Sequence, residues 1–501
     1  MVNQKTDLKL LSFLKITFFV LMNLTLQRLL IDFKKINLFF WIIISIGLIV
    51  YKLSFHELWK DEWQAWLVAR DLSLSNMLAF LNYEGHPSLW YLYLKAWTIL
   101  PIQEHILLQM SHGVLVVVAL YYLFVRISLP TLWKVLISFS YFIVFEYGVI
   151  NRGYILVILL SIIALDLIVR NNKSWILGLT LLLLCQTEAY GVIITAAIIV
   201  YLFLNSEGNK LILFRKTILW SLTGFLLFVF TVFPRGNEDD FTRAYNQQSF
   251  SIKVIHESIQ GHLANVFTIG LIDDTASNGV SSLGFMISIL LLSIIVWIFV
   301  RDWRILLSMI FGLLAFIIFG MLIFSGGVRQ WGMVYLLFIL MLILSHHKKS
   351  KWSFSRYVLV ITLMIAPMVH GIKALITDVQ IPFSNAQEVG QFIKENVPYN
   401  VPVVVINKFE TAPVGAYADR SLYELPSGEE FTYFKWLEKV YIPTQSEIFL
   451  FARFKNVGGI VLLSPSPIDP KRFPNAVLWQ EFSNENFKRE NYWLYSIPLT
   501  K

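Results

Sequence analysis

Acidic, imidazole and guanidinium side chains recur at the ends of the long apolar runs of this sequence. The adjacent pair Asp61 and Glu62 lies in the segment HELWKDEWQAWLVARD (56–71), directly after the first clear run. A carboxylate beside a substrate hydroxyl can act as a general base, and two adjacent carboxylates can supply oxygen ligands to Mg²⁺ or Mn²⁺. We therefore take Asp61 and Glu62 as the candidate catalytic pair. A divalent metal on this pair stays open, and no other cofactor is indicated.

Helical periodicity separates the two carboxylates of segment 56–71. At about 100° per residue, one stripe of the helix carries large apolar side chains that suit the headgroup boundary of a membrane, namely Trp59, Trp63, Trp66 and Leu67. Asp61 points nearly opposite, beside the small side chains of Ala65 and Val68, whereas Glu62 borders the stripe. This geometry predicts Asp61 as the base and Glu62 as its support. An ordinary amphipathic helix with a solvated acidic face would show the same pattern.

A turn with ionisable residues follows, Tyr83-Glu84-Gly85-His86-Pro87, and precedes a short apolar segment. Glycine and proline favour a turn, and an imidazole there can contact a phosphate or orient a carboxylate. His86 is therefore a candidate substrate-binding residue. A histidine at a turn is also commonly a simple polar cap.

Two arginines beside glycines start apolar runs, Arg152 in NRGY and Arg329 in GGVRQWG. A guanidinium offers fixed, paired donors to a phosphate. A single arginine at a membrane boundary commonly only extends its charged end to water, but two in matching positions favour a shared anion site. Glu188 and Glu146 are weaker candidates, because each could satisfy a polar neighbour inside the bundle.

Composition places these residues in a membrane protein. The chain has 501 residues, of which 56% are hydrophobic and only 15% charged, and its mean hydropathy is +0.64. A soluble chain is about a quarter charged. The single cysteine excludes a disulfide framework. The net charge of +8 lies mostly in short loops between apolar runs, so it indicates topology rather than a nucleic-acid partner.

About eleven membrane spans are predicted from the apolar runs: 37–53, 105–125, 132–149, 153–170, 174–188, 189–205, 217–233, 283–300, 305–324, 331–345 and 357–373. The pair at 174–205 depends on a break at Gln186–Glu188, because one long helix there would reverse all later spans. Residues 1–35 are interpreted as a cytoplasmic or interfacial segment, with an extra span as the alternative. Basic short loops place the N-terminus in the cytoplasm.

This topology puts all the candidate residues on the outer side of a bacterial plasma membrane. Three outer segments are large: 54–104, 234–282 and 374–501. Residues 86–100 are apolar but too short to span, so we expect them to lie along or dip into the outer interface. Residues 36–376 form the transmembrane domain, and 377–501 alternate helix and strand patterns. The predicted fold is a mostly α transmembrane bundle with a small extracytoplasmic α/β domain.

The acidic pair after the first span, followed by Gly85-His86-Pro87 at the start of an apolar segment, resembles the C-type (GT-C) superfamily of membrane glycosyltransferases. The pattern is most similar to protein O-mannosyltransferases and bacterial lipid A aminoarabinose transferases. The likeness covers about residues 37–373.

Two helix starts add to the likeness. NRGYILVILL resembles the Arg-x-Tyr start of these families, and VRQWGMVYLLFILML resembles their Arg-His-x-Gly start, with Gln330 in place of the histidine. Ser88 stands where the common His-Pro-Pro-Leu has its second proline. These departures leave the acceptor and the role of the second arginine open.

The resemblance implies an inverting transfer of a monosaccharide from a polyprenyl-phosphate donor to a glycan, lipid or protein acceptor on the non-cytoplasmic face. Asp61 would be the general base, with Glu62 supporting it or helping to bind a metal. Arg152 and Arg329 would hold the departing phosphate, with His86 and Glu188 as further substrate contacts.

Two other classes of function are compatible with many spans and polar helix ends. A transporter or flippase of lipid-linked glycans is one, although transporters usually place their site near the membrane midplane between internal repeats, and no repeat is visible here. A non-catalytic subunit whose outer domain recruits an enzyme is the other. The combination of acidic pair and both arginines favours the enzyme.

Overall fold

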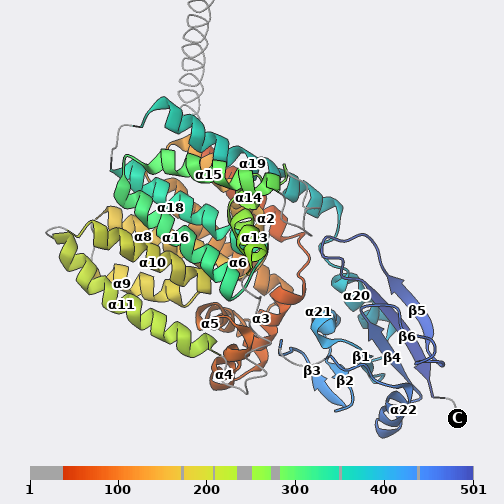
Figure 1. Cartoon of the computed structure of the whole chain (residues 1–501). Coiled ribbons are helices and arrows are strands. Elements are labelled where there is room, and N and C mark those ends of the chain that lie inside the picture. Colours follow the sequence, from red (N-terminus) through yellow and green to blue (C-terminus); the bar gives the residue numbers. More distant parts are fainter. Residues whose placement is uncertain are drawn as a thin grey trace, which may run out of the picture.

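The chain forms a bundle of apolar helices followed by a mixed α/β domain (Figure 1). The computed structural model describes residues 38–170, 174–206, 209–233, 251–271, 282–348, 352–436 and 440–499. The segment 1–35, for which an interfacial helix was expected, lies outside the described residues. So do parts of the outer segment 234–282.

The helices of the bundle follow the predicted spans closely. Each predicted span coincides with helical structure: α2 (Leu38–Leu53), α6 (Glu104–Tyr121) with η1 (Tyr122–Arg126), α7 (Thr131–Ser138) with η2 (Phe142–Glu146), α8 (Tyr154–Val169), α9 (Ser174–Cys185), α10 (Ala189–Leu204), α11 (Asn209–Val232), α15 (Ser282–Phe299), α16 (Trp303–Leu322), α17 (Val328–Trp331) with α18 (Met333–His347), and α19 (Phe354–Gln380). Six of these helices are long and apolar enough to cross a membrane, and four are shorter apolar helices. The chain is therefore an integral membrane protein.

The stretch 132–149 is not the continuous span that its composition predicts. Helix α7 ends at Ser138, and a π-helical turn, η2, follows. At the break, the backbone N–H of Ser140 donates to the carbonyl of Ile137, three residues back (3.1 Å), and the hydroxyl of Ser140 donates to the same carbonyl (2.7 Å). After the break, η2 ends at Glu146, which lies beside Arg329 (2.8 Å).

The break predicted between 188 and 189 is present, since α9 ends at Cys185 and α10 starts at Ala189. Polar contacts stabilise this break between α9 and α10. The side-chain amide of Gln186 donates to the carbonyl of Gly224 (2.8 Å), and the carbonyl of Gln186 accepts from the backbone N–H of Leu89 (3.1 Å). Glu188 therefore caps the start of α10 and lies 2.8 Å from His86.

Shorter helices pack against the bundle: α3 (Lys60–Asp71), α4 (Leu74–Glu84), α5 (Ser88–Trp97), α13 (Ile252–His262) and α14 (Ala264–Phe267). The tryptophan stripe of α3 does not face the headgroup boundary as expected. Trp63 and Trp66 are each 1% exposed, because α3 packs between α5 and the C-terminal domain. Trp63 meets Tyr417 of that domain edge to face. The stripe thus anchors α3 inside the protein.

The C-terminal domain is built on a six-stranded mixed sheet in the order β3-β2-β1-β4-β6-β5. Its elements are α20 (Ala386–Asn396), β1 (Val403–Val405), α21 (Lys408–Ala418), β2 (Leu422–Glu424), β3 (Glu429–Phe431), α22 (Gln445–Phe454), β4 (Gly459–Ser464), β5 (Val477–Phe482) and β6 (Tyr492–Pro498). Strand β1 pairs in parallel with β2 and β4, whereas β6 runs antiparallel to both β4 and β5. The domain lies at one end of the bundle, beside α3 (Figure 1).

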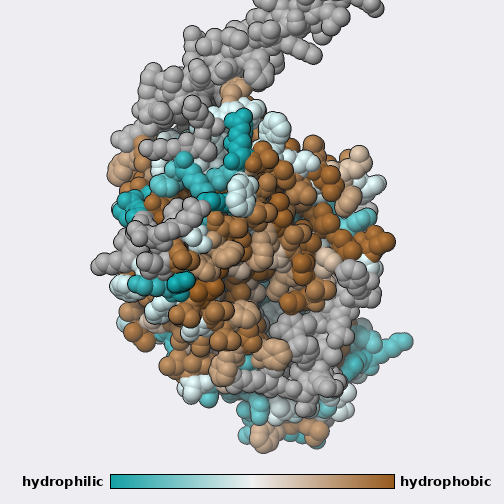
Figure 2. Space-filling model, turned by 60° about the vertical axis from the view of Figure 1, so that its left-hand side comes forward, coloured by the Kyte–Doolittle hydropathy of each residue, from teal (hydrophilic) through white to brown (hydrophobic). Residues whose placement is uncertain are grey.

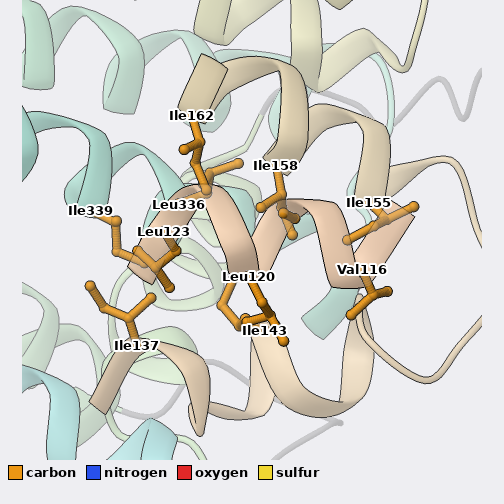
Figure 3. Close-up of a pocket in the computed structure, with 11 residues that line it drawn as sticks. Val116, Leu120, Leu123, Ile137, Ile143, Ile155, Ile158, Ile162, Leu336 and Ile339 are labelled. Atoms are coloured by element: carbon orange, nitrogen blue, oxygen red, sulfur yellow. The ribbon is translucent and has the colours of Figure 1, made fainter. Parts of the chain in front are cut away.

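One face of the bundle is broadly hydrophobic (Figure 2). Large apolar side chains of α11, α15 and α16 are more than half exposed, among them Leu219, Leu226, Met286, Leu290 and Leu322. Inside the bundle, apolar side chains of α6, α8 and α18 converge on a gap of about 20 Å³ (Figure 3). That gap has room for about one water and no polar lining, so it is a packing void rather than a binding site.

Candidate active site

A cavity of about 840 Å³ opens at the end of the bundle that carries α3, between α3, α4, the start of α8 and the end of α16. Its wall has two chemically different parts. One part is charged and polar, with Asp61, Glu84, His86, Arg152, Glu188 and Arg329. The other part is apolar and comes from the ends of α11 and α16, with Phe228, Val229, Val232, Phe319, Leu322 and Phe324. The volume suits a ligand of substantial size.

Asp61 lies in the charged part and faces two arginines. Its Oδ2 is 2.6 Å from Nη1 of Arg152 and 3.5 Å from Nη1 of Arg329. Burial raises the pKa of Asp61, but the two guanidinium groups outweigh it, Arg152 more than Arg329, so that the pKa lies below its ordinary value. Asp61 is therefore a carboxylate at neutral pH. Ala65, one turn further along α3, also lines the cavity, as the helical wheel predicted.

Arg329 is held by residues that converge on it from η2 and α3. Its Nε donates to Glu146 (2.8 Å), which also accepts from the hydroxyl of Tyr141 (2.7 Å). The guanidinium lies over the ring of Trp59 at 5.4 Å, and the hydroxyl of Tyr147 donates to the carbonyl of Arg329 (2.6 Å). The side chain is thus fixed before any ligand binds.

Arg152 belongs to a second network of polar side chains, together with His86 and Glu188. His86 Nδ1 lies 2.8 Å from Oε2 of Glu188, and its Nε2 lies 3.4 Å from Nη2 of Arg152. Because a guanidinium can only donate, Nε2 accepts and Nδ1 donates to Glu188. A Cβ on Gly153 would meet Oε1 of Glu188 at 3.0 Å, so a glycine at this position allows the close approach. Arg152 also precedes the N-terminus of α8, where the helix dipole favours anions.

Glu62 is absent from the cavity wall and is fully buried on the other side of α3. Its Oε1 accepts from the backbone N–H (2.6 Å) and the side-chain amide (3.0 Å) of Asn151, the residue before Arg152. Its Oε2 accepts from the backbone N–H of Trp59 (3.1 Å) and lies 3.3 Å from His56 Nε2. Glu62 therefore ties α3 to the loop that carries Arg152.

His56 extends this network to the transmembrane helices. Its Nδ1 lies 3.3 Å from Asp378 of α19, which is 3.0 Å from Nζ of Lys52 in α2. Burial lowers the pKa of His56, but the carboxylates of Glu62 and Asp378 more than offset this and raise the pKa to about 9. The imidazole is therefore protonated at neutral pH and balances two buried carboxylates. All four charges are almost fully shielded from solvent.

The C-terminal domain reaches the cavity through α3. The side-chain amide of Gln64 donates to the carbonyl of Phe434 (2.6 Å) and accepts from its backbone N–H (3.2 Å). Two residues on, Trp436 lines the cavity. Gln64 also donates to Glu84 (2.8 Å). Burial raises the pKa of Glu84, and the bonds from Gln64 and Tyr91 only partly oppose this.

The site does not fit the divalent metal that was considered on Asp61 and Glu62. Asp61 lines the cavity, whereas Glu62 points about 100° away around α3 and is absent from the cavity wall. Each carboxylate already has cationic or N–H partners. Within the described parts of the chain, no three His, Cys, Asp or Glu side chains are close enough together to hold a metal ion. We therefore assign no step to a metal.

The structure thus brings five of the six predicted site residues to one cavity and places Glu62 behind it. Sequence reasoning missed His56 and Trp436. His56 stands in the quoted segment 56–71, but its partner Asp378 lies 322 residues away. The opposite charges of Lys52 and Asp378, near the ends of two predicted spans, were a signal that could have indicated this buried network. Trp436 carries no comparable signal, because only the fold of the C-terminal domain brings it to α3.

Comparison with solved structures identifies the fold. The chain is similar to ArnT from Cupriavidus metallidurans in its apo state, with a TM-score of 0.52 and 10% sequence identity, over 91% of this chain and 97% of that chain. The chain therefore shares the overall fold of ArnT. No family model matches the sequence, and no curated protein matches it.

Proposed function

We propose that this protein is a glycosyltransferase that moves a monosaccharide, with inversion, from a polyprenyl-phosphate donor to an acceptor hydroxyl. The observation that carries the proposal is the composition of the wall of the 840 Å³ cavity: a carboxylate between two fixed arginines, continuous with an apolar surface between α11 and α16. The fold shared with ArnT and the resemblance to the GT-C superfamily support the same class of activity.

The two arginines suit the donor phosphate, and the apolar wall suits the polyprenyl chain. Arg152 and Arg329 both contact Asp61 Oδ2 in the absence of a ligand. A phosphate that entered between them would compete for the same donors. Near the apolar wall, Phe233 and Leu322 are 55% and 59% exposed, so an isoprenoid chain can enter from the bilayer without leaving its apolar surroundings.

Asp61 would then act as the base. Once the donor phosphate takes over the guanidinium groups, the charges that lower the pKa of Asp61 are partly neutralised, and its basicity rises. The acceptor hydroxyl would give its proton to Asp61 while its oxygen bonds to the anomeric carbon. The bond between that carbon and the phosphate oxygen breaks, and Arg152 and Arg329 stabilise the polyprenyl phosphate that leaves.

The site would lie on the non-cytoplasmic face. Arg126 and Arg170 share Asp166 at the ends of α6 and α8 that are remote from Asp61, and basic residues favour the cytoplasmic side. The C-terminal domain packs on α3, at the cavity end. A reporter enzyme that is active only outside the cytoplasm should therefore be active when fused after residue 376.

A transfer assay tests the proposal. Purified protein is reconstituted in liposomes with polyprenyl-phosphate monosaccharides that carry a radiolabel in the sugar, and label is followed on acceptors and as free sugar. We expect Asp61→Asn to reduce turnover by at least about a hundredfold, the usual scale for loss of a general base. Asp71→Asn is the matched control, because Asp71 ends the same helix and bonds Arg70 and Thr432 away from the cavity.

Equal turnover in wild type and Asp61→Asn, or no turnover from any donor, would refute the proposed glycosyltransferase activity. Protein-dependent flipping of the labelled lipid without transfer would instead favour the flippase considered above.

A further inference from the structure

The C-terminal domain contributes a side chain to the cavity that the proposed transfer of sugar does not use. Trp436 lines the cavity together with Asn82, Tyr83 and Glu84 of α4. These four side chains carry no cation, in contrast to the arginine pair beside Asp61. The ammonium of Lys435 lies over the ring of Tyr83 at 5.1 Å, but Lys435 is absent from the cavity wall. The four side chains therefore suit a neutral, hydrogen-bonding ligand rather than a phosphate.

Hydrogen bonds and aromatic contacts fix the position of Trp436. The paired hydrogen bonds between Gln64 and the backbone of Phe434 fix the segment two residues before it. Its ring packs edge to face on Phe434 at 4.8 Å and stacks with Phe409 at 6.2 Å. Trp436 nevertheless stays 41% exposed, so part of an aromatic face remains open at the cavity.

Asn82 provides a second, independent observation. Its side chain is 6% exposed and lines the cavity. The amide nitrogen donates to the carbonyl of Ala79 (3.0 Å), but the amide oxygen accepts no hydrogen bond from the described residues. A buried acceptor without a donor is costly. A ligand hydroxyl at this wall would remove that cost.

An open aromatic face beside amide and carboxyl oxygens matches a sugar ring, which presents C–H groups on one face and hydroxyls at its edge. Gln64 and Glu84 lie on the wall next to Asp61, since Gln64 follows Asp61 by three residues on the same face of α3. The soluble domain supplies the tryptophan, so this wall is on the aqueous side. The lipid-borne donor approaches by the apolar wall instead.

We propose that Asn82, Glu84 and Trp436 form an acceptor subsite that binds a neutral saccharide and directs one of its hydroxyls to Asp61. This rests on the proposed glycosyl transfer and adds that the acceptor is a glycan, recognised jointly by the bundle and the C-terminal domain. A peptide or a free lipid is not the acceptor.

Direct binding tests the subsite without any turnover. Full-length protein in detergent, without donor, is titrated with neutral trisaccharides of glucose, mannose, galactose and N-acetylglucosamine, and binding is followed by ligand-observed NMR. We expect at least one trisaccharide to bind, and Trp436→Ala and Asn82→Leu each to weaken its affinity about tenfold. Trp479→Ala on β5 is the matched control, because Trp479 is also 41% exposed but is absent from the cavity wall.

The transfer assay separates failure of this subsite from failure of the proposed function. With labelled donor, Trp436→Ala and Asn82→Leu should raise KM for the saccharide about tenfold, whereas Trp479→Ala should leave both this KM and the release of free sugar to water within about twofold of wild type. Saccharide binding that both variants retain, an unchanged KM for the saccharide in both variants, or transfer to peptide alone would each overturn the subsite. Only inactivity of the wild type, or indifference to Asp61→Asn, would overturn the glycosyltransferase.

Discussion

The buried network behind α3 makes a measurable prediction about Glu62. Replacing Glu62 by glutamine keeps the size of the side chain and one acceptor oxygen but removes the negative charge 3.3 Å from His56. The pKa of His56 stands at about 9 in the folded protein against 6.5 for a free imidazole. Each pKa unit corresponds to about 1.4 kcal/mol, so the protonated form gains about 3 kcal/mol of stability on folding.

Glu62 is the strongest of the influences that raise the pKa of His56, ahead of Asp378. We therefore assign it most of this energy and expect Glu62→Gln to lower the free energy of unfolding by about 2 kcal/mol at pH 6. Because the folded pKa is raised, the contribution is complete below pH 6.5 and is lost as the pH rises through 9. The difference between wild type and variant should therefore shrink above pH 9.

Equilibrium unfolding in mixed micelles with sodium dodecyl sulfate, repeated from pH 6 to 10, measures this difference. Glu395→Gln is the control, because Glu395 is exposed on α20. If Glu62→Gln lowers stability by an amount that does not change with pH, the claim that His56 is protonated in the folded protein is refuted. An unchanged stability at pH 6 would refute the whole network.

Two further predictions concern packing and charge. Gly332→Ala should lower the melting temperature and the affinity for polyprenyl phosphate, because a Cβ there would lie 2.2 Å from Phe142 and 2.5 Å from the hydroxyl of Tyr147 that holds Arg329; wild-type affinity measured by native mass spectrometry would contradict this. Burial, only partly opposed by Ser384, raises the pKa of Glu490 from 4.5 to about 7, so its ionisation costs stability that is absent below pH 4.5 and complete above pH 7. Glu490→Gln should therefore stabilise the protein by about 3 kcal/mol at pH 8.5 and by little at pH 4.5 in the same unfolding assay; equal effects at both pH values would contradict this.

Local sequence patterns predict the helical bundle well, because the bilayer constrains which segments can span it. Apolar runs of sufficient length predict spans directly, and even the break at Gln186–Glu188 was visible as three polar residues inside such a run. The break inside 132–149 was not, because its serines also occur in intact helices and only the packing of η2 against α19 shows the difference. The hairpin of β2 and β3 was not predicted either, because its strands are short and β2 depends on pairing with β1.

The candidate site was only partly within reach of sequence reasoning. Topology alone collects ionisable helix ends on one surface, and so it grouped Asp61, Arg152 and Arg329 correctly. A helical wheel separates Asp61 from Glu62 but does not reveal what covers either face. The tryptophan stripe was assigned to the headgroup boundary because its real neighbour, Tyr417, is more than 350 residues away.

The most direct test of the account is an experimental structure of the protein with polyprenyl phosphate bound, determined by electron cryomicroscopy in lipid nanodiscs. We expect the phosphate between Arg152 and Arg329, the first isoprene units along Phe228, Phe319 and Phe324, and an Asp61 that no longer touches Arg152. A phosphate bound elsewhere, with the 2.6 Å pair of Asp61 and Arg152 intact, would contradict it.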